Sequence, residues 1–157
     1  MPTITLDELA ERIEAKYEPT SIPLPDGRVV KLTVPFRLSK ERKAEIKAVS
    51  KAHNDAVAKA EHAQKMRDLN NEQRAKDNLE PVELTDEDQE RLTEQAEQRT
   101  LTYLRGMVRA AAEDRTSAEE LLRILAGQGD DEILVLTELV TAYMKSSQVG
   151  EASPSPS

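Results

Sequence analysis

Cysteine and tryptophan are both absent from this 157-residue chain. The lack of cysteine excludes disulfide bonds, thiolate catalysis and thiolate metal sites, and it fits a reducing compartment. Aromatic residues make up only 3% of the chain, and Phe36 is the single phenylalanine. Because few side chains can each bury a large apolar area, we expect thin helix-on-helix packing and modest stability.

Long hydrophobic runs are missing as well. No stretch approaches the roughly 18 apolar residues that a membrane-spanning helix needs. The start of the chain, Met1-Pro2-Thr3-Ile4, has neither the basic nor the apolar region of a signal peptide. We therefore expect a soluble protein that is not exported and does not bind a membrane.

Charge is plentiful but unevenly distributed around a net charge of −8. The segment from Arg37 to Lys76 has a net charge of +5, and the segment from Asp77 to Thr100 has a net charge of −7. This pattern favours two solvated helices whose opposite charges help them pair. The basic segment also contains six acids and no aromatic residue. It thus has neither an uninterrupted row of basic residues to bind phosphates nor aromatic side chains on which bases could stack, so nucleic acid is not an expected partner.

The first forty residues contain signals for a helix and a β-hairpin. Thr5 and Glu8 form a capping-box pattern before an amphipathic helix over residues 6–17. Pro25-Asp26-Gly27 is a turn signature between strands at 21–24 and 28–34. Pro23 marks the first strand as an edge. A hairpin alone is marginal in water, so we expect a helix or a partner to cover it.

The remainder of the chain predicts four helices. Ser39 is a good N-cap for a long helix whose apolar stripe fades after Ala63. The next helix begins at Thr85 and runs to about Glu113, with its apolar residues concentrated in the second half. A short helix capped by Thr116-Ser117-Ala118-Glu119 follows, and the last helix starts at Asp130-Asp131.

The predicted fold class is mainly α: a helical bundle with a small N-terminal β-hairpin and a long charged helical hairpin. We divide the chain into an N-terminal helix plus hairpin at 1–38, a charged antiparallel helical hairpin at 39–113, C-terminal helices at 114–148 and a disordered tail at 149–157. The loop of the charged hairpin is expected near 70–85, because Asn70-Asn71 opens a polar run that ends at Glu80-Pro81.

Catalytic and metal-binding patterns are not found. The only two histidines, His53 and His62, are nine residues apart and so project to opposite sides of one helix. We expect His53 to pack between helices and His62 to face solvent. The acids at 86–90 lie on different helical faces and lack the EF-hand spacing. We predict no catalytic residues, no cofactor and no metal.

The C-terminal helices have more large aliphatic residues than a two-helix edge needs. One interpretation is that they pack on the preceding helix and the hairpin. The other is an apolar groove for a partner helix, because exposed apolar patches tend to be binding sites. We expect Ile133, Leu136 and Val140 in the core, and Leu134 and Val135 at least partly exposed. The candidate partner-binding residues are Leu121, Leu122, Leu125, Leu134 and Val135, with Ile22 and Leu24 on the hairpin.

The order of these elements resembles the tail assembly chaperones of long-tailed bacteriophages, especially the actinobacterial siphophage type. The similarity covers roughly residues 3–45 and 118–157. The stretches that carry it are the Thr-Leu-Asp-Glu-Leu helix, Tyr17-Glu18-Pro19, Ile22-Pro23-Leu24-Pro25-Asp26-Gly27, Lys40-Glu41-Arg42-Lys43, Leu136 to Tyr143 and Gln148 to Ser155.

The resemblance implies a protein that binds the tape measure protein in the host cytoplasm and keeps it soluble until the tail tube protein assembles around it. It also implies absence from the mature virion and, in many members, a longer form made by ribosomal frameshifting. Two other classes stay open from the residues alone: a helical scaffolding or structural virion protein, and a nucleic-acid-binding regulator.

Overall fold

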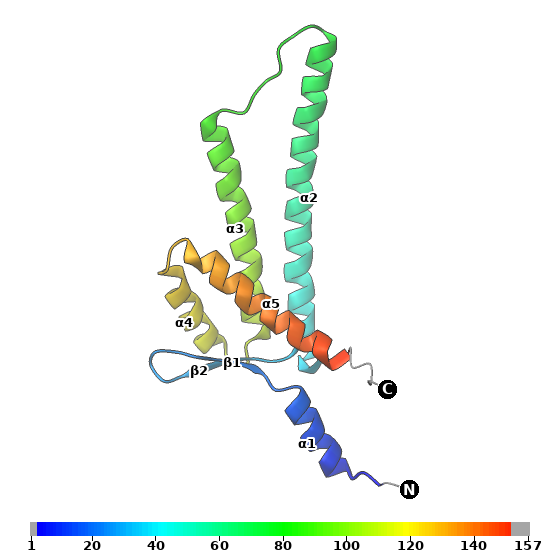
Figure 1. The fold of residues 1–157 in the computed structure, drawn as a ribbon, viewed down its shortest axis with the longest axis vertical. Helices are drawn as coiled ribbons and strands as arrows, with labels where there is room; N and C mark the ends of the chain where they lie inside the picture. Colours follow the sequence, from blue (N-terminus) through cyan, green and yellow to red (C-terminus); the bar gives the residue numbers. More distant parts are fainter. Residues whose placement is uncertain (1–2, 152–157) are drawn as a thin grey trace. The chain divides into compact units, whose positions relative to one another are not determined.

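The structure, a computed structural model, describes residues 3–151, and the chain forms two compact units. Unit 1 contains the residues up to Ile46 and those from Leu104 onward, and unit 2 is Lys47–Tyr103. The elements are α1 (Leu6–Lys16), β1 (Thr20–Pro23), β2 (Val29–Leu32), the 3-10 helix η1 (Pro35–Arg37), α2 (Lys40–Lys76), α3 (Asp86–Ala111), α4 (Arg115–Ala126) and α5 (Asp131–Glu151). The mainly helical class with one small hairpin is confirmed (Figure 1).

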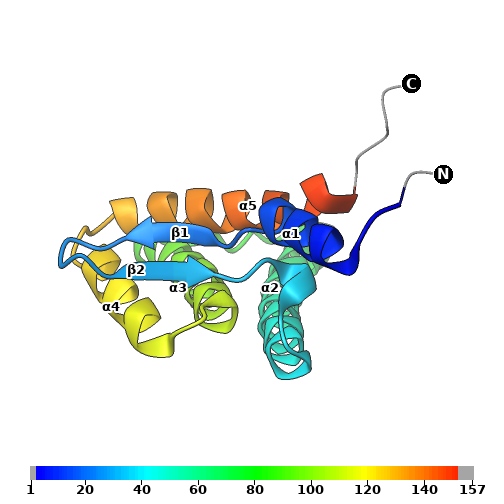
Figure 2. The same ribbon diagram turned by 90° about the horizontal axis from the view of Figure 1, so that it is seen from below.

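The hairpin of unit 1 forms where the turn signature places it. β1 and β2 pair antiparallel, with Thr20 opposite Leu32 and Pro23 opposite Val29 (Figure 2). Gly27 has a φ of +89°, a conformation that side-chain-bearing residues rarely adopt. Asp26 accepts a hydrogen bond from the backbone amide of Arg28 at 2.9 Å. Local contacts therefore stabilise the turn.

The outer edge of β2 is covered by the segment that follows α3. The amide of Thr33 donates to the carbonyl of Ala111 at 2.9 Å, and the amide of Glu113 donates to the carbonyl of Lys31 at 2.9 Å. These bonds satisfy edge groups that would otherwise need water. The expectation that other elements cover the hairpin is thus met within unit 1.

The core of unit 1 forms where α4 packs on β2 and α5, and where α5 reaches η1. Arg42 Nη1 donates to the carbonyl of Arg109 at 2.9 Å, which joins the start of α2 to the end of α3. The largest fully buried side chains are Val30, Leu32, Val34, Met107, Val108, Leu136 and Tyr143. The apolar second half of the 85–113 segment is therefore the buried half, as its sequence predicts.

Within unit 2, α2 and α3 run antiparallel (Figure 1). The His53 and Tyr103 rings lie 4.6 Å apart between their centroids, and His62 is exposed, so both histidine predictions are confirmed. The ion pairs found among residues 47–103 lie within single helices, such as Lys51–Asp55 at 3.8 Å. The opposite charges of the two helices therefore do not meet as direct ion pairs in this part of the chain.

The predicted loop near 70–85 is too long, because α2 continues to Lys76 and the connection is residues 77–85. The Asn71 side chain accepts from the Val82 amide at 2.8 Å and donates to the Val82 carbonyl at 3.1 Å. Arg74 Nε donates to the carbonyl of Glu80 at 2.7 Å. Asn71 and Arg74 thus form hydrogen bonds with the connection that follows α2. These bonds explain why the helix extends through a polar segment.

Two further boundaries differ from the prediction. The N-cap of α4 is Asp114, not Thr116: its carboxylate accepts from the backbone amides of Thr116 and Ser117. α5 continues to Glu151, so residues 149–151 are helical where we expected a disordered tail. The remainder of that predicted tail, residues 152–157, lies outside the described residues.

Candidate interaction surface

The described residues do not form a metal site or a membrane span. Within residues 3–151, no group of three or more His, Asp or Glu side chains is placed to hold a metal ion. No helix in that range is long and apolar enough to cross a membrane. Unit 2 contains an open hollow of about 340 Å³ lined mainly by polar side chains, among them Gln64, Arg67 and Gln89. An open polar hollow of this kind has no convergent set of groups that would identify a ligand.

The structure contradicts an open groove along α4. The fractional exposure of Leu121, Leu122 and Leu125 is 4–6%, and that of Leu24 on the hairpin is 6%. The leucines of α4 recur at helical spacing on the face that packs against β2 and α5. Burying a leucine contributes about 1.5–3 kcal/mol to folding, so these four side chains belong to the core and are not available to a partner. Ile22 is half-buried.

The outward side of α5 agrees with the sequence prediction. Leu136 and Val140 are buried as predicted, whereas Ile133, also expected in the core, is only half-buried. Leu134 is 65% exposed and Val135 is 39% exposed. α5 therefore presents Leu134 and Val135, with Met144 further along, to solvent from a helix whose other face is packed.

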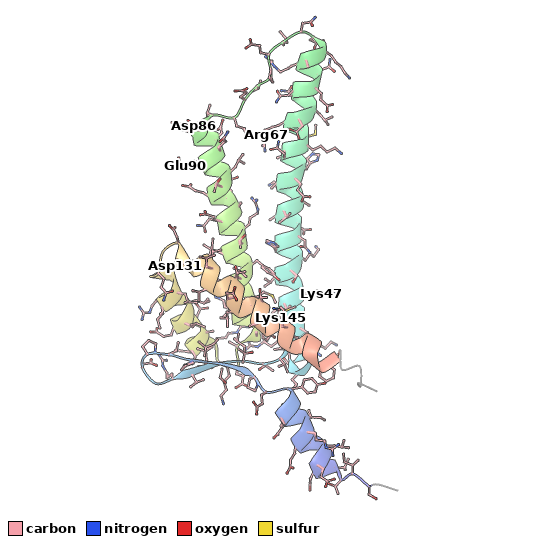
Figure 3. All side chains as sticks on the ribbon, in the orientation of Figure 1. Lys47, Arg67, Asp86, Glu90, Asp131 and Lys145 are labelled. Atoms are coloured by element: carbon pink, nitrogen blue, oxygen red, sulfur yellow. The ribbon has the colours of Figure 1, made fainter. Side chains whose placement is uncertain are left out.

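The orientation of α5 is set by contacts along its inner face. Tyr143 is fully buried, and that burial raises the pKa of its phenol. Near the start of α5, the carboxylate of Glu132 accepts a hydrogen bond from Arg105 Nε at 2.8 Å. Figure 3 shows Asp131 at the start of this helix and Lys145 further along it. Leu134 is held outward because the residues around it are fixed inward.

The large apolar side chains with the highest fractional exposure lie elsewhere, on α1 and η1. Leu6 is 83% exposed, and both Leu9 and Ile13 are exposed. Phe36, the only phenylalanine, is 67% exposed and stacks on Tyr17 with ring centroids 5.6 Å apart. No other element lies alongside α1 in Figure 1, and every described side chain of this helix is exposed.

The exposed residues of α1 and η1 were not among the predicted partner-binding residues. The available signal was the apolar stripe of residues 6–17, which shows that one face is apolar but not what covers it. The spacing of apolar residues does not show whether another element covers the helix, because an uncovered stripe and a packed stripe have the same spacing.

Comparison with known proteins identifies the chain at the level of a family. Neither a curated protein nor a solved structure matches it. The family described as Mycobacteriophage tail assembly protein matches residues 1–152, which is nearly the whole chain. The match extends through the charged middle of the chain as well as the two ends. This chain belongs to the mycobacteriophage tail assembly protein family.

Proposed function

We propose that this tail assembly protein is a chaperone that binds the tape measure protein and keeps it soluble in the host cytoplasm. It acts by binding alone, without catalysis. The tail tube protein then assembles around the tape measure protein, and the chaperone leaves before the particle is complete. A longer, frameshifted form of the same chain is a second partner of this protein. Family membership and the resemblance of residues 3–45 and 118–157 to tail assembly chaperones support this function.

The observation that carries the proposal is the presence of exposed apolar side chains on rigid helices. Leu134 and Val135 face solvent from α5, whose opposite face is anchored by buried Leu136 and Val140. A single exposed leucine is ordinary on a soluble protein. Two adjacent apolar residues on a packed helix, in a protein of an assembly family, provide a preformed contact for an apolar client segment.

The charge of the chain supports the same function. A net charge of −8 keeps exposed apolar surface in solution by electrostatic repulsion between molecules. A small apolar contact area gives modest affinity and fast release. Modest affinity suits a protein that must hand its client to the tube subunits, since tight binding would block that transfer.

Leu134→Asp tests the proposal. The substitution puts a charge at an exposed position, so the melting temperature and the far-UV circular dichroism spectrum should remain nearly unchanged. Binding an apolar client there would require that charge to be desolvated, so the yield of soluble tape measure protein on co-expression should fall. Lys145→Ala, also exposed on α5, is the surface control and should keep the wild-type yield.

Two results would count against the proposal. Failure of the wild-type chain to raise the yield of soluble tape measure protein would remove the chaperone function. An unchanged yield with Leu134→Asp would remove α5 as the contact surface. Ile22, half-buried on the edge strand β1, would then be the next residue to test for strand addition. Extensive self-association without client in size-exclusion chromatography would instead favour a scaffolding protein.

A further inference from the structure

α1 is an amphipathic helix that no described residue of unit 1 covers. It has 11 residues, and an isolated helix of that length is marginal in water. Its capping box is complete, with the Glu8 amide donating to Thr5 Oγ1 at 3.1 Å and the Thr5 amide donating to the Glu8 carboxylate at 2.9 Å. The cap stabilises the first turn, but it does not bury the apolar stripe.

The apolar stripe of α1 continues into an aromatic pair. Leu6, Leu9, Ile13 and Tyr17 recur at intervals of three and four, so they share one face of the helix. At the end of that row the Tyr17 ring stacks on exposed Phe36. Tyrosine is enriched among the residues that dominate binding energy at interfaces, and Tyr17 is half-buried here beside exposed Phe36.

An acidic row runs along one side of the stripe, and the exposed Arg12 lies on its other side. Asp7, Glu11 and Glu14 are also spaced by four and three, and all three are exposed. Among the side chains that the structure describes, none forms an ion pair with them. These unpaired carboxylates favour a partner with Lys or Arg beside its own apolar row.

The same features disfavour three other occupants. The carboxylates of Asp7, Glu11 and Glu14 repel the phosphates of nucleic acids and of anionic lipids. Membrane-surface helices usually have Lys and Arg along both borders of the apolar face, whereas one border of α1 is acidic. A second copy of this chain is a disfavoured occupant because the apolar face of α1 is too small for a stable dimer. A stable dimer buries about 800 Å² on each partner, which is more than one face of a short helix supplies. A weak helix-to-helix contact fits both the charge and the size.

We propose that the stripe of α1, with Tyr17 and Phe36, docks an amphipathic helix whose apolar row is flanked by Lys and Arg. The tape measure protein supplies that helix, a statement that rests on the proposed function. The contact extends the client-binding surface beyond α5 and adds a charge rule that selects among the client's helical segments.

Two synthetic peptides of about 20 residues, long enough to form a helix, test the docking surface on the full-length chain. They share one leucine row and differ only in flanking residues, Lys in one and Glu in the other. Fluorescence anisotropy should show binding of the Lys peptide and weaker binding of the Glu peptide. Leu9→Asp should weaken binding of the Lys peptide by about tenfold or more, since it places a charge in the apolar contact.

Matched variants on α1 separate docking from helix stability. Ala15→Asp adds the same charge on the opposite side of α1, where it should leave binding unchanged. Replacing both Glu11 and Glu14 with Lys should reverse the preference, so that the Glu peptide binds more tightly. Circular dichroism of each variant checks that the helix content is kept.

The outcomes distinguish this proposal from the proposed function. Equal binding of both peptides, or equal binding by Leu9→Asp and wild type, overturns the docking surface even if the wild-type chain solubilises the tape measure protein. Peptide binding as expected, with no solubilisation by the wild-type chain, overturns the chaperone function while the charge-selective helix contact stands. A wild-type dimer in sedimentation experiments that Leu9→Asp dissociates would show that a second copy covers the stripe, which also overturns the proposal.

Discussion

Arg105 of α3 and Glu132 of α5 form a largely buried ion pair in unit 1. Arg105 Nε donates to Glu132 Oε1 at 2.8 Å, and Arg105 Nη2 donates to the same oxygen. The Glu132 side chain is 7% exposed and the Arg105 side chain 30%. The pair joins two helices that are distant in sequence, and it fixes the first turn of α5 from which Leu134 projects.

Glu132→Ala should destabilise unit 1 by about 1–3 kcal/mol. A fully buried charge that loses its partner costs about 3–5 kcal/mol, and solvent access to Arg105 lowers that figure. Replacing both residues with Leu should recover much of the loss, because no buried charge is left unpaired. Urea denaturation measures the three proteins. A double variant as unstable as Glu132→Ala would show that the pair is not the source of the effect.

The cap of α4 should make stability depend on pH in the acid range. Hydrogen bonds from the Ser117 hydroxyl and from the backbone amides of Ser117 and Thr116 lower the pKa of Asp114 below its ordinary value of 3.8. A carboxyl group with a lowered pKa in the folded state stabilises the fold above its unfolded pKa. That contribution is lost as the pH falls through its folded pKa.

Asp114→Asn isolates this contribution, because asparagine keeps a capping oxygen but does not titrate in this range. The wild-type chain should melt at a higher temperature than the variant at pH 6, and the difference should shrink as the pH falls below about 4. Melting curves between pH 6 and pH 2 measure it. If the difference in melting temperature stays constant over this range, the ionisation of Asp114 does not contribute to the stability of the fold.

Hydrogen exchange should be faster over residues 66–84 than over residues 101–112. None of the described side chains in the first segment is buried, whereas Leu104, Met107 and Val108 in the second are. Asn71→Ala should raise exchange at the Val82 amide in particular, because it removes the acceptor of that amide. Equal protection in both segments would show that the charged helices are as well packed as the core.

The two histidines should be dispensable for client binding. Replacing His53 and His62 with Gln should leave the yield of soluble tape measure protein unchanged, since His62 faces solvent and His53 packs on Tyr103. Losing that ring contact should cost about 0.5–1.5 kcal/mol, visible as a lower melting temperature. A folded double variant that no longer solubilises the client would reveal a binding or catalytic site that includes a histidine.

Local signals in the sequence predict much of this fold, because each acts over a few residues. Thr5 caps α1, the Arg42 amide donates to Ser39 Oγ at 3.2 Å, and Gly27 occupies the turn that its neighbours predict. Where a predicted helix boundary was wrong, a longer-range or competing hydrogen bond determined where the helix begins or ends. Asn71 resembles a helix breaker in sequence, but in the structure it bonds to Val82, eleven residues further on.

The sequence by itself determines that α1 and α4 are both amphipathic, because the spacing of apolar residues is a property of each helix alone. Only the tertiary structure decides that the leucines of α4 are buried while Leu6, Leu9 and Ile13 of α1 are exposed. Burial requires a second apolar surface at contact distance. β2 and α5 provide that surface for α4, and none of the described residues of unit 1 provides one for α1.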